Sequence, residues 1–230
     1  MLLSEADLGP AAAGDGLPVP EEPPLMPSLT EQGREFALRL SIDMTARATT
    51  RPVTAAAPAL LPLPPVLRRA VLRRLLTRLV PDADAYFFGG KRKTIRQRLR
   101  DAITGAGGSV VVVSHSLGTV VAYDVLSDPA FAARTVPAFV TLGSPLGYTE
   151  IQDVITKPRQ VPAPVRIWAN FADPLDVVTL DTMLAHEFGP PSRVIDAVVD
   201  NPSPNNHAAC GYLRAPQVRA VVNAALLQPA

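Results

Sequence analysis

The sequence predicts an α/β fold, in which a mainly parallel sheet is flanked by helices. Short runs of valine, alanine and other apolar residues recur along the second half of the chain, as expected for strands that are buried on both faces. Helical or loop segments separate these runs, and this alternation is typical of parallel sheets. One run of four valines, 110–113, leads through a short turn directly into an apolar helical segment.

Length and composition limit the class of protein. The 230 residues, 47% of them hydrophobic, are enough for one main domain with a substantial core. The formal net charge of +1 gives no reason to expect binding to nucleic acid. The single cysteine, Cys210, cannot form an internal disulfide. Because the first residues do not resemble a signal peptide and no stretch is long enough to span a bilayer, we expect a soluble cytoplasmic protein.

The first part of the chain differs from the rest in composition. Residues 1–65 are rich in proline and alanine, and we expect them to be partly disordered because they can bury little apolar surface. Thr30 is a candidate N-cap for one helix within this segment. That helix has three apolar side chains for packing, Phe36, Leu38 and Leu40. Residues 66–230 are then expected to form the core.

A basic amphipathic helix is predicted over residues 66–80. Its leucines fall at helical spacing, and its arginines take the opposite side of the helix. The simplest interpretation is a cap or surface helix with solvated arginines. A weak contact with a membrane surface through this helix is the alternative.

The remaining elements follow in order along the chain. The predicted strands are 109–113, 138–142, 165–171 and 194–199, and the predicted helices that flank them include 91–103 and 217–227. Successive β-α-β units favour a parallel sheet with right-handed crossovers. Ligands of such sheets bind at the carboxyl ends of the strands, so polar residues that follow the strands are the candidate site.

The segment Ser114-His115-Ser116-Leu117-Gly118 lies between a predicted strand and a predicted helix. This is the context of a nucleophile elbow, which holds its serine in a strained conformation at the top of a sheet. Small residues are expected two positions before and after Ser116, because strand and helix approach closely there. Gly118 meets this expectation, and Ser114 stands where the G-x-S-x-G pattern has glycine.

A serine nucleophile needs a base that takes its proton and an acid that orients the base. Asp176 is the preferred acid, whereas Asp173, nearer the strand end, is the reserve acid and otherwise caps the loop through backbone amides. Among the three histidines, His207 is the preferred base, because its loop follows the last strand and can reach back over the sheet edge. His115 should point away from the serine across the turn, and His186 precedes the last strand.

The order Ser116, Asp176, His207 is the order expected for α/β-hydrolases. Residues 85–228 resemble lipase-like serine esterases of that superfamily, through the segments 112–124, 142–146, 170–178 and 207–213. The resemblance implies hydrolysis of a small-molecule acyl ester or lipid through an acyl-enzyme, without a metal or organic cofactor. It also implies that Gly143-Ser144-Pro145 shapes the acyl pocket, so that Ser144 is structural, and it adds a lid role to the alternatives for residues 66–80.

One departure from the superfamily concerns the oxyanion hole. Members normally have strands before the elbow, one of which ends in a His-Gly segment that supplies a backbone donor. No such strand is found in residues 1–66, so we expect the fold to lack its N-terminal strands, or an irregular segment to replace them. Leu117 can still donate its N–H, but one missing donor can lower turnover by about a hundredfold. The alternative function is therefore a catalytically impaired hydrolase-fold protein with a binding or assembly role.

Overall fold

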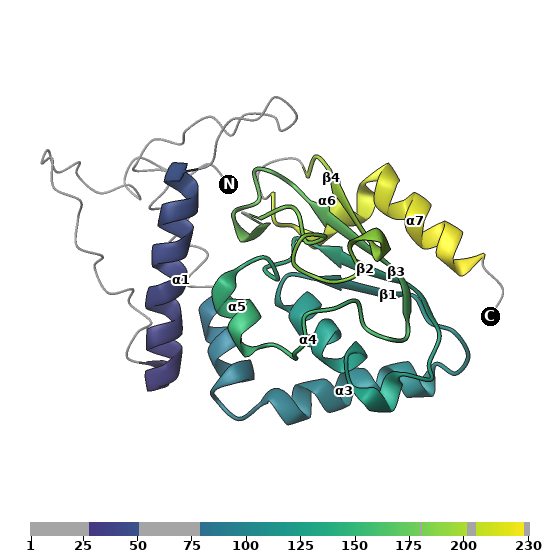
Figure 1. Cartoon of the computed structure of the whole chain (residues 1–230), viewed down its shortest axis with the longest axis horizontal. Helices are drawn as coiled ribbons and strands as arrows, with labels where there is room; N and C mark the ends of the chain where they lie inside the picture. Colours follow the sequence, from purple (N-terminus) through teal and green to yellow (C-terminus); the bar gives the residue numbers. More distant parts are fainter. Residues whose placement is uncertain (1–27, 51–78, 180, 202–205, 228–230) are drawn as a thin grey trace, which may run out of the picture.

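A computed structural model describes residues 28–50, 79–179, 181–201 and 206–227 of the chain (Figure 1). Within these ranges, four strands form one all-parallel sheet in the order β1-β2-β3-β4, with helices on both faces. The strands are β1 (Val112–His115), β2 (Val136–Leu142), β3 (Val165–Ala172) and β4 (Val194–Val198). The α-helices are α1 (Glu31–Thr50), α3 (Arg92–Gly105), α4 (Leu117–Leu126), α5 (Thr149–Val154), α6 (Ala209–Arg214) and α7 (Pro216–Leu226). The predicted α/β fold class is confirmed.

Each strand pairs with the next one along the chain. Val113 of β1 lies opposite Val140 of β2, and Val140 lies opposite Ala169 of β3. The first strand was predicted over 109–113, but it runs from Val112 to His115, because its pairing with β2 continues up to the elbow. Since all four strands are parallel, the loops that follow them meet at one edge of the sheet.

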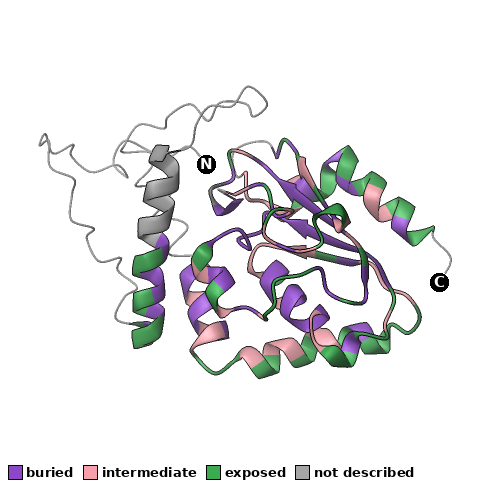
Figure 2. Cartoon of the chain, viewed as in Figure 1, coloured by how far each residue is buried: buried purple, intermediate pink, exposed green. Residues whose placement is uncertain are grey.

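Both faces of the sheet are covered, which explains the apolar strands. Figure 2 shows buried residues concentrated in the strands and in α4, whereas α3 and α7 carry exposed residues on their outer sides. On the α4 face, Trp168 packs against Phe139 and Phe188, with ring centroids 5.0 and 4.9 Å apart. On the opposite face, Val218 of α7 belongs to the cluster that covers β2 and β3.

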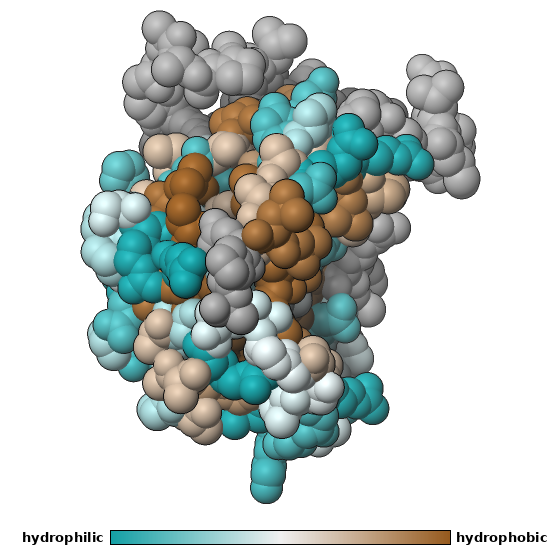
Figure 3. Space-filling view, turned by 90° about the vertical axis from the view of Figure 1, so that its right-hand side faces the viewer, coloured by the Kyte–Doolittle hydropathy of each residue, from teal (hydrophilic) through white to brown (hydrophobic). Residues whose placement is uncertain are grey.

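The packing of α7 leaves part of the sheet accessible. Val113 on β1 and Ile195 on β4 lie on the α7 face, in register with the covered residues of the middle strands, and are 39% and 48% exposed. Figure 3, which views the molecule from the side where α7 ends, shows hydrophobic surface interspersed with hydrophilic residues. One helix therefore covers the two central strands more fully than the outer two.

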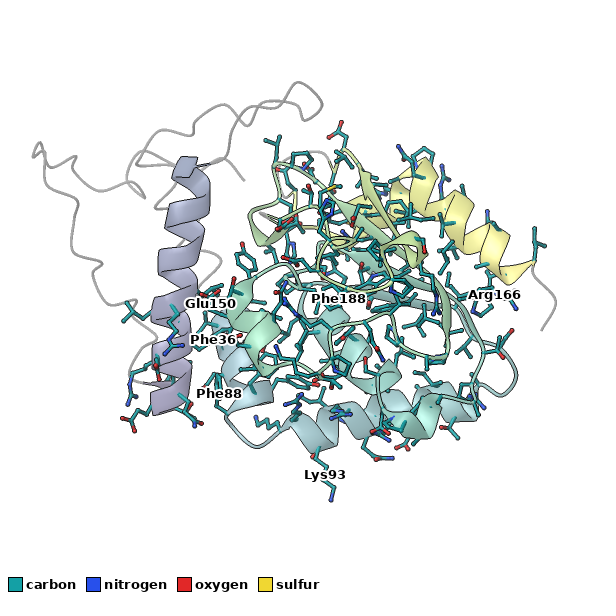
Figure 4. All side chains as sticks on the ribbon, viewed as in Figure 1. Phe36, Phe88, Lys93, Glu150, Arg166 and Phe188 are labelled. Atoms are coloured by element: carbon teal, nitrogen blue, oxygen red, sulfur yellow. The ribbon has the colours of Figure 1, made fainter. Side chains whose placement is uncertain are left out.

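Helix α1 is attached to the core through its first turns. Thr30 Oγ1 accepts a hydrogen bond from the Gly33 N–H (3.0 Å), so the predicted N-cap is confirmed. The same hydroxyl donates to the carboxylate of Asp84, which belongs to the helical segment 79–87. Phe36 packs against Phe88, with ring centroids 5.8 Å apart, between α1 and the rest of the molecule (Figure 4).

Not every predicted contact of α1 is made. Phe36 and Leu40 are buried, but Leu38 is 46% exposed, so the prediction that it packs on the core was wrong. Leu38 lies two residues from Phe36 and two from Leu40. On an α-helix, this spacing places its side chain on the opposite side of the helix.

Two predictions fall largely outside the described residues. The predicted domain boundary at residue 65 lies outside them, as do residues 66–78 of the predicted basic helix. The last two residues of that prediction, 79 and 80, are helical and buried. Within the ranges that are described, no helix has the length and apolar character needed to cross a membrane.

Candidate active site

Ser116 occupies a strained turn between β1 and α4. Its φ is 55° and its ψ is −135°, and no other non-glycine residue in the described ranges has a positive φ. Such a conformation costs about 1–3 kcal/mol and is maintained only where the surroundings enforce it. Here the Ser116 N–H is held by the Leu142 carbonyl (3.0 Å), and the Ser116 carbonyl accepts from Thr119. The turn therefore presents the Ser116 hydroxyl at the carboxyl end of β1.

The steric explanation of the elbow pattern needs a correction at Gly118. A Cβ atom built there would meet nothing within 4 Å, so close packing of strand and helix does not demand glycine at this position. Ser114 is half-buried, and its hydroxyl donates to the Val140 carbonyl (3.3 Å). The serine that replaces glycine in the pattern is thus accommodated by a hydrogen bond to the neighbouring strand.

Ser116, His207 and Asp176 form a continuous chain of hydrogen bonds. The Ser116 hydroxyl lies 2.8 Å from His207 Nε2, and His207 Nδ1 lies 2.8 Å from Asp176 Oδ2. An ionised carboxylate can only accept, so the bond to Asp176 requires the proton on Nδ1 and leaves Nε2 free to accept from the serine. The structure thus brings together three side chains that are up to 91 residues apart in sequence.

Asp176 is fully buried and is surrounded by donors. Besides His207, the Tyr212 hydroxyl donates to Oδ2 (2.7 Å) and the Val178 N–H donates to Oδ1 (2.9 Å). Burial first, and the adjacent charge of Asp176 second, raise the pKa of Tyr212, so the phenol stays protonated as a donor. This environment suits an ionised carboxylate that holds the His207 ring in one orientation.

The reserve acid, Asp173, accepts hydrogen bonds from groups of the surrounding loops. Its carboxylate accepts from the Leu175 N–H (2.7 Å), the Asn201 N–H (2.9 Å) and the side-chain amide of Asn206 (3.1 Å). These are bonds to loop groups, as expected for the carboxylate that caps the loop. His207 makes its carboxylate contact with Asp176.

His115 has a contact that its sequence position did not suggest. Its Nε2 lies 2.8 Å from the His207 carbonyl, which can only accept, so His115 donates at this nitrogen. The two imidazole rings are 4.5 Å apart. Burial first, and the nearby charge of His207 second, lower the pKa of His115, and the backbone hydrogen bond to His207 only partly offsets them. His186, by contrast, is exposed in the loop before β4.

Gly143 is a site residue that sequence reasoning treated only as part of a pocket segment. Its φ is +56°, and a Cβ atom there would lie 2.9 Å from Asp176 Oδ2 and 3.1 Å from His207 Nδ1. A side chain at this position would therefore intrude on the bond between histidine and carboxylate. The adjacent Ser144 is buried and hydrogen-bonds to Thr119 Oγ1 (2.8 Å), a contact between the loop after β2 and α4.

The Leu117 amide, the predicted oxyanion donor, lies at the start of a helix. Helix α4 begins at Leu117, so this N–H belongs to the first turn, where helical amides have no carbonyl partner within the helix. The positive end of the helix macrodipole also lies there. In the described part of the chain, β1 is an edge strand and no strand precedes it. The same part holds no cluster of three or more His, Cys, Asp or Glu side chains that could bind a metal.

A parallel sheet that carries a strained serine turn, with histidine and carboxylate loops at the same edge, is typical of the α/β-hydrolase class. Within that class, residues 93–158 match the family model of the PGAP1-like alpha/beta domain, which describes a lipase-like α/β-hydrolase family. The predicted resemblance is therefore confirmed. The match includes Ser116 and Leu117 but ends before Asp176 and His207. No curated protein and no solved structure shows significant similarity to the chain.

Proposed function

We propose that the chain is a serine hydrolase that cleaves a carboxylic ester or a related acyl bond. The observation that carries the proposal is the hydrogen-bonded chain from Ser116 through His207 to Asp176, with the serine on a strained turn. The similarity of residues 93–158 to a lipase-like family supports the same chemistry and favours an acyl ester or lipid as substrate.

The acylation step follows from the proposed roles. His207 Nε2 takes the proton from the Ser116 hydroxyl while Oγ attacks the acyl carbon, and the carbonyl oxygen becomes an oxyanion. The Leu117 N–H donates to that oxyanion. Asp176 keeps the imidazole in the correct tautomer and stabilises the imidazolium that forms. The intermediate collapses when His207 passes its proton to the leaving alcohol.

Deacylation repeats these roles with water as the nucleophile. His207 removes a proton from a water molecule, and the resulting hydroxide attacks the acyl-enzyme. The second tetrahedral intermediate releases the carboxylic acid as the proton returns to Ser116 Oγ. The serine is thereby regenerated without a net change in charge on the protein.

The decisive experiment is reaction of the purified full chain with a fluorophosphonate probe, followed by intact mass measurement. We expect a single adduct that is absent from Ser116→Ala and present in Ser144→Ala, which serves as a matched control on the neighbouring buried serine. Esters of increasing acyl length, tested next, would define the substrate range. A folded wild-type protein that stays unlabelled would contradict the proposal and favour the binding or assembly role.

A further inference from the structure

Two carboxylates three positions apart, Asp173 and Asp176, bind different parts of the segment that carries His207. Asp176 contacts the imidazole, whereas Asp173 contacts the Asn201 backbone and the Asn206 side chain. We infer that Asp173 is a positioning residue: with Asn201 and Asn206, it clamps the His207 segment so that the imidazole faces both Ser116 and Asp176. This inference rests on the proposed function for its catalytic meaning, but the clamp can be tested independently.

The Asp173 carboxylate joins three pieces of backbone. Oδ1 accepts from the Leu175 N–H within its own loop, and Oδ2 accepts from the Asn201 N–H and from Asn206 Nδ2. The side chain is buried, so its negative charge depends on these donors for stabilisation. Removal of any one of them would leave a buried charge with fewer partners.

Asn201 extends the clamp to both sides of His207. Its side-chain amide donates to the Asn206 carbonyl (2.6 Å) and to the Ala208 carbonyl (2.9 Å). In return, Asn206 Nδ2 donates to the Asn201 carbonyl (2.8 Å). The residues immediately before and after His207 are therefore tied to one fully buried side chain.

The start of α6 closes over this clamp. A Cβ atom at Gly211 would lie 1.5 Å from Asn201 Oδ1, so glycine allows the helix backbone to approach Asn201 directly. The next residue is Tyr212. Its hydroxyl accepts a hydrogen bond from the Asp173 N–H (3.0 Å) and donates one to Asp176 Oδ2. Tyr212 thus connects the backbone of Asp173 to the carboxylate of Asp176.

The functional consequence comes from the geometry of proton transfer. His207 must keep two hydrogen bonds of 2.8 Å on opposite sides of its ring. A displacement of about 1 Å can lower a catalysed rate by about a hundredfold. A clamp on both neighbours of His207 restricts such displacements, which a simple loop cap on one backbone group would not.

The test uses Asn206→Ala, because Asn206 is half-buried and its loss leaves the core intact. Asn223→Ala on the exposed surface of α7 is the matched control. Nuclear magnetic resonance of histidine-labelled full chain, with His207 assigned from His207→Gln, reports which ring nitrogen carries the proton. We expect wild type and Asn223→Ala to hold the Nδ1–H tautomer, and Asn206→Ala to show exchange between tautomers while it stays folded, with a melting temperature lowered by only a few degrees.

Kinetics give the second readout. In Asn206→Ala we expect the fluorophosphonate labelling rate and kcat for an ester to fall by about 10- to 100-fold, with KM changed less than about twofold. Asp173→Asn should act in the same direction, because the amide cannot accept from all three donors. A wild-type His207 without a fixed tautomer, or an Asn206→Ala variant with wild-type tautomer and rates, would overturn the inference.

The two proposals fail in different ways. A wild-type protein that does not react with the probe would refute the serine hydrolase, while the tautomer of His207 in Asn206→Ala would still decide the clamp. A reactive wild type with an unaffected Asn206→Ala would refute only the clamp.

Discussion

Two buried carboxylates in this molecule have closely similar surroundings but different partners. Asp124 on α4 and Asp176 after β3 are both fully buried, and each accepts a 2.7 Å hydrogen bond from a buried tyrosine, Tyr86 or Tyr212. Asp124 also pairs with the guanidinium of Arg92, a permanent cation, at 2.6 Å. Asp176 pairs with the imidazole of His207, whose second ring nitrogen faces the Ser116 hydroxyl.

The region around Asp124 joins elements rather than presenting a reactive group. Its second oxygen accepts from the backbone and the hydroxyl of Thr156, so α3, α4 and the loop after α5 meet at one side chain. Next to it, Arg96 and Arg100 both pair with Asp128. A surface hollow of about 530 Å³ lies beside these groups, lined by aromatic and basic side chains including Tyr86 and Arg92. Its three arginines already have carboxylate partners.

The comparison separates two uses of a buried carboxylate. Burial does not distinguish Asp124 from Asp176, and in both carboxylates each oxygen accepts at least one hydrogen bond. The difference is whether the partner can take up and release a proton during a reaction, which the guanidinium of Arg92 cannot do and an imidazole can. We therefore assign a structural role to Asp124 and a role in the proposed chemistry to Asp176.

The largest effect should come from Asp176→Asn. An amide at this position would favour the wrong tautomer of His207, so we expect kcat/KM for an ester to fall by about 10,000-fold, with a smaller effect on folding. Steady-state kinetics combined with thermal unfolding provide the measurement. If Asp173→Asn proved the more damaging of the two variants, the assignment of the acid would have to be reversed.

Asp124→Asn should lower the stability of the protein but leave the reactivity of Ser116 unchanged. Loss of one member of a buried ion pair typically destabilises a protein by about 3–5 kcal/mol, and the partial exposure of Arg92 places our expectation at about 3 kcal/mol. Denaturant unfolding would measure this loss, and the folded fraction should keep the wild-type labelling rate. An unchanged free energy of unfolding would contradict a structural role.

The two tyrosines offer a matched pair of smaller changes. Tyr86→Phe and Tyr212→Phe each remove one hydroxyl from a buried carboxylate, so each should lower the free energy of unfolding by about 1–3 kcal/mol. Only Tyr212→Phe should also slow labelling of Ser116, because its hydroxyl orients Asp176. Parallel unfolding and labelling experiments test this, and equal labelling rates in both variants would argue against the distinction.

The smallest effect concerns pH and His115. Its folded pKa lies below the ordinary value of about 6.5, because of burial first and His207 second, so the unfolded chain binds the proton more readily. Stability should thus decrease as pH falls below about 6.5 and level off once pH is below the folded pKa. His115→Gln keeps a donor for the His207 carbonyl but cannot titrate. Its free energy of unfolding should change less between pH 7 and pH 5 than that of wild type.

The sequence predicted the sheet and the order of the candidate residues because these depend on local patterns. Apolar runs marked the strands, and the turn after β1 marked the strained serine. The contacts of Asp173 with Asn201 and of His115 with His207 could not be predicted, because they join segments 28 and 92 residues apart. The catalytic roles of Ser116, Asp176 and His207 stay predictions that the proposed variants test.

Gly143 is another residue whose relation to the candidate site could not be predicted from the sequence. A glycine after a strand usually indicates a turn, and here φ is indeed positive. A side chain is excluded at this position because Asp176 and His207, which belong to two later loops, lie too close. Only the folded arrangement relates this glycine to the candidate site.

The attachment of α1 has a practical consequence for recombinant production. Phe36 and Leu40 lie in the same buried cluster as Tyr86, with Phe88 packed against it. A truncated chain starting at residue 79 would keep the sheet and all candidate site residues. It would lack α1, however, and would leave the rings of Tyr86 and Phe88 uncovered. We expect such a fragment to self-associate during purification, whereas one starting at residue 28 should stay monodisperse in size-exclusion chromatography.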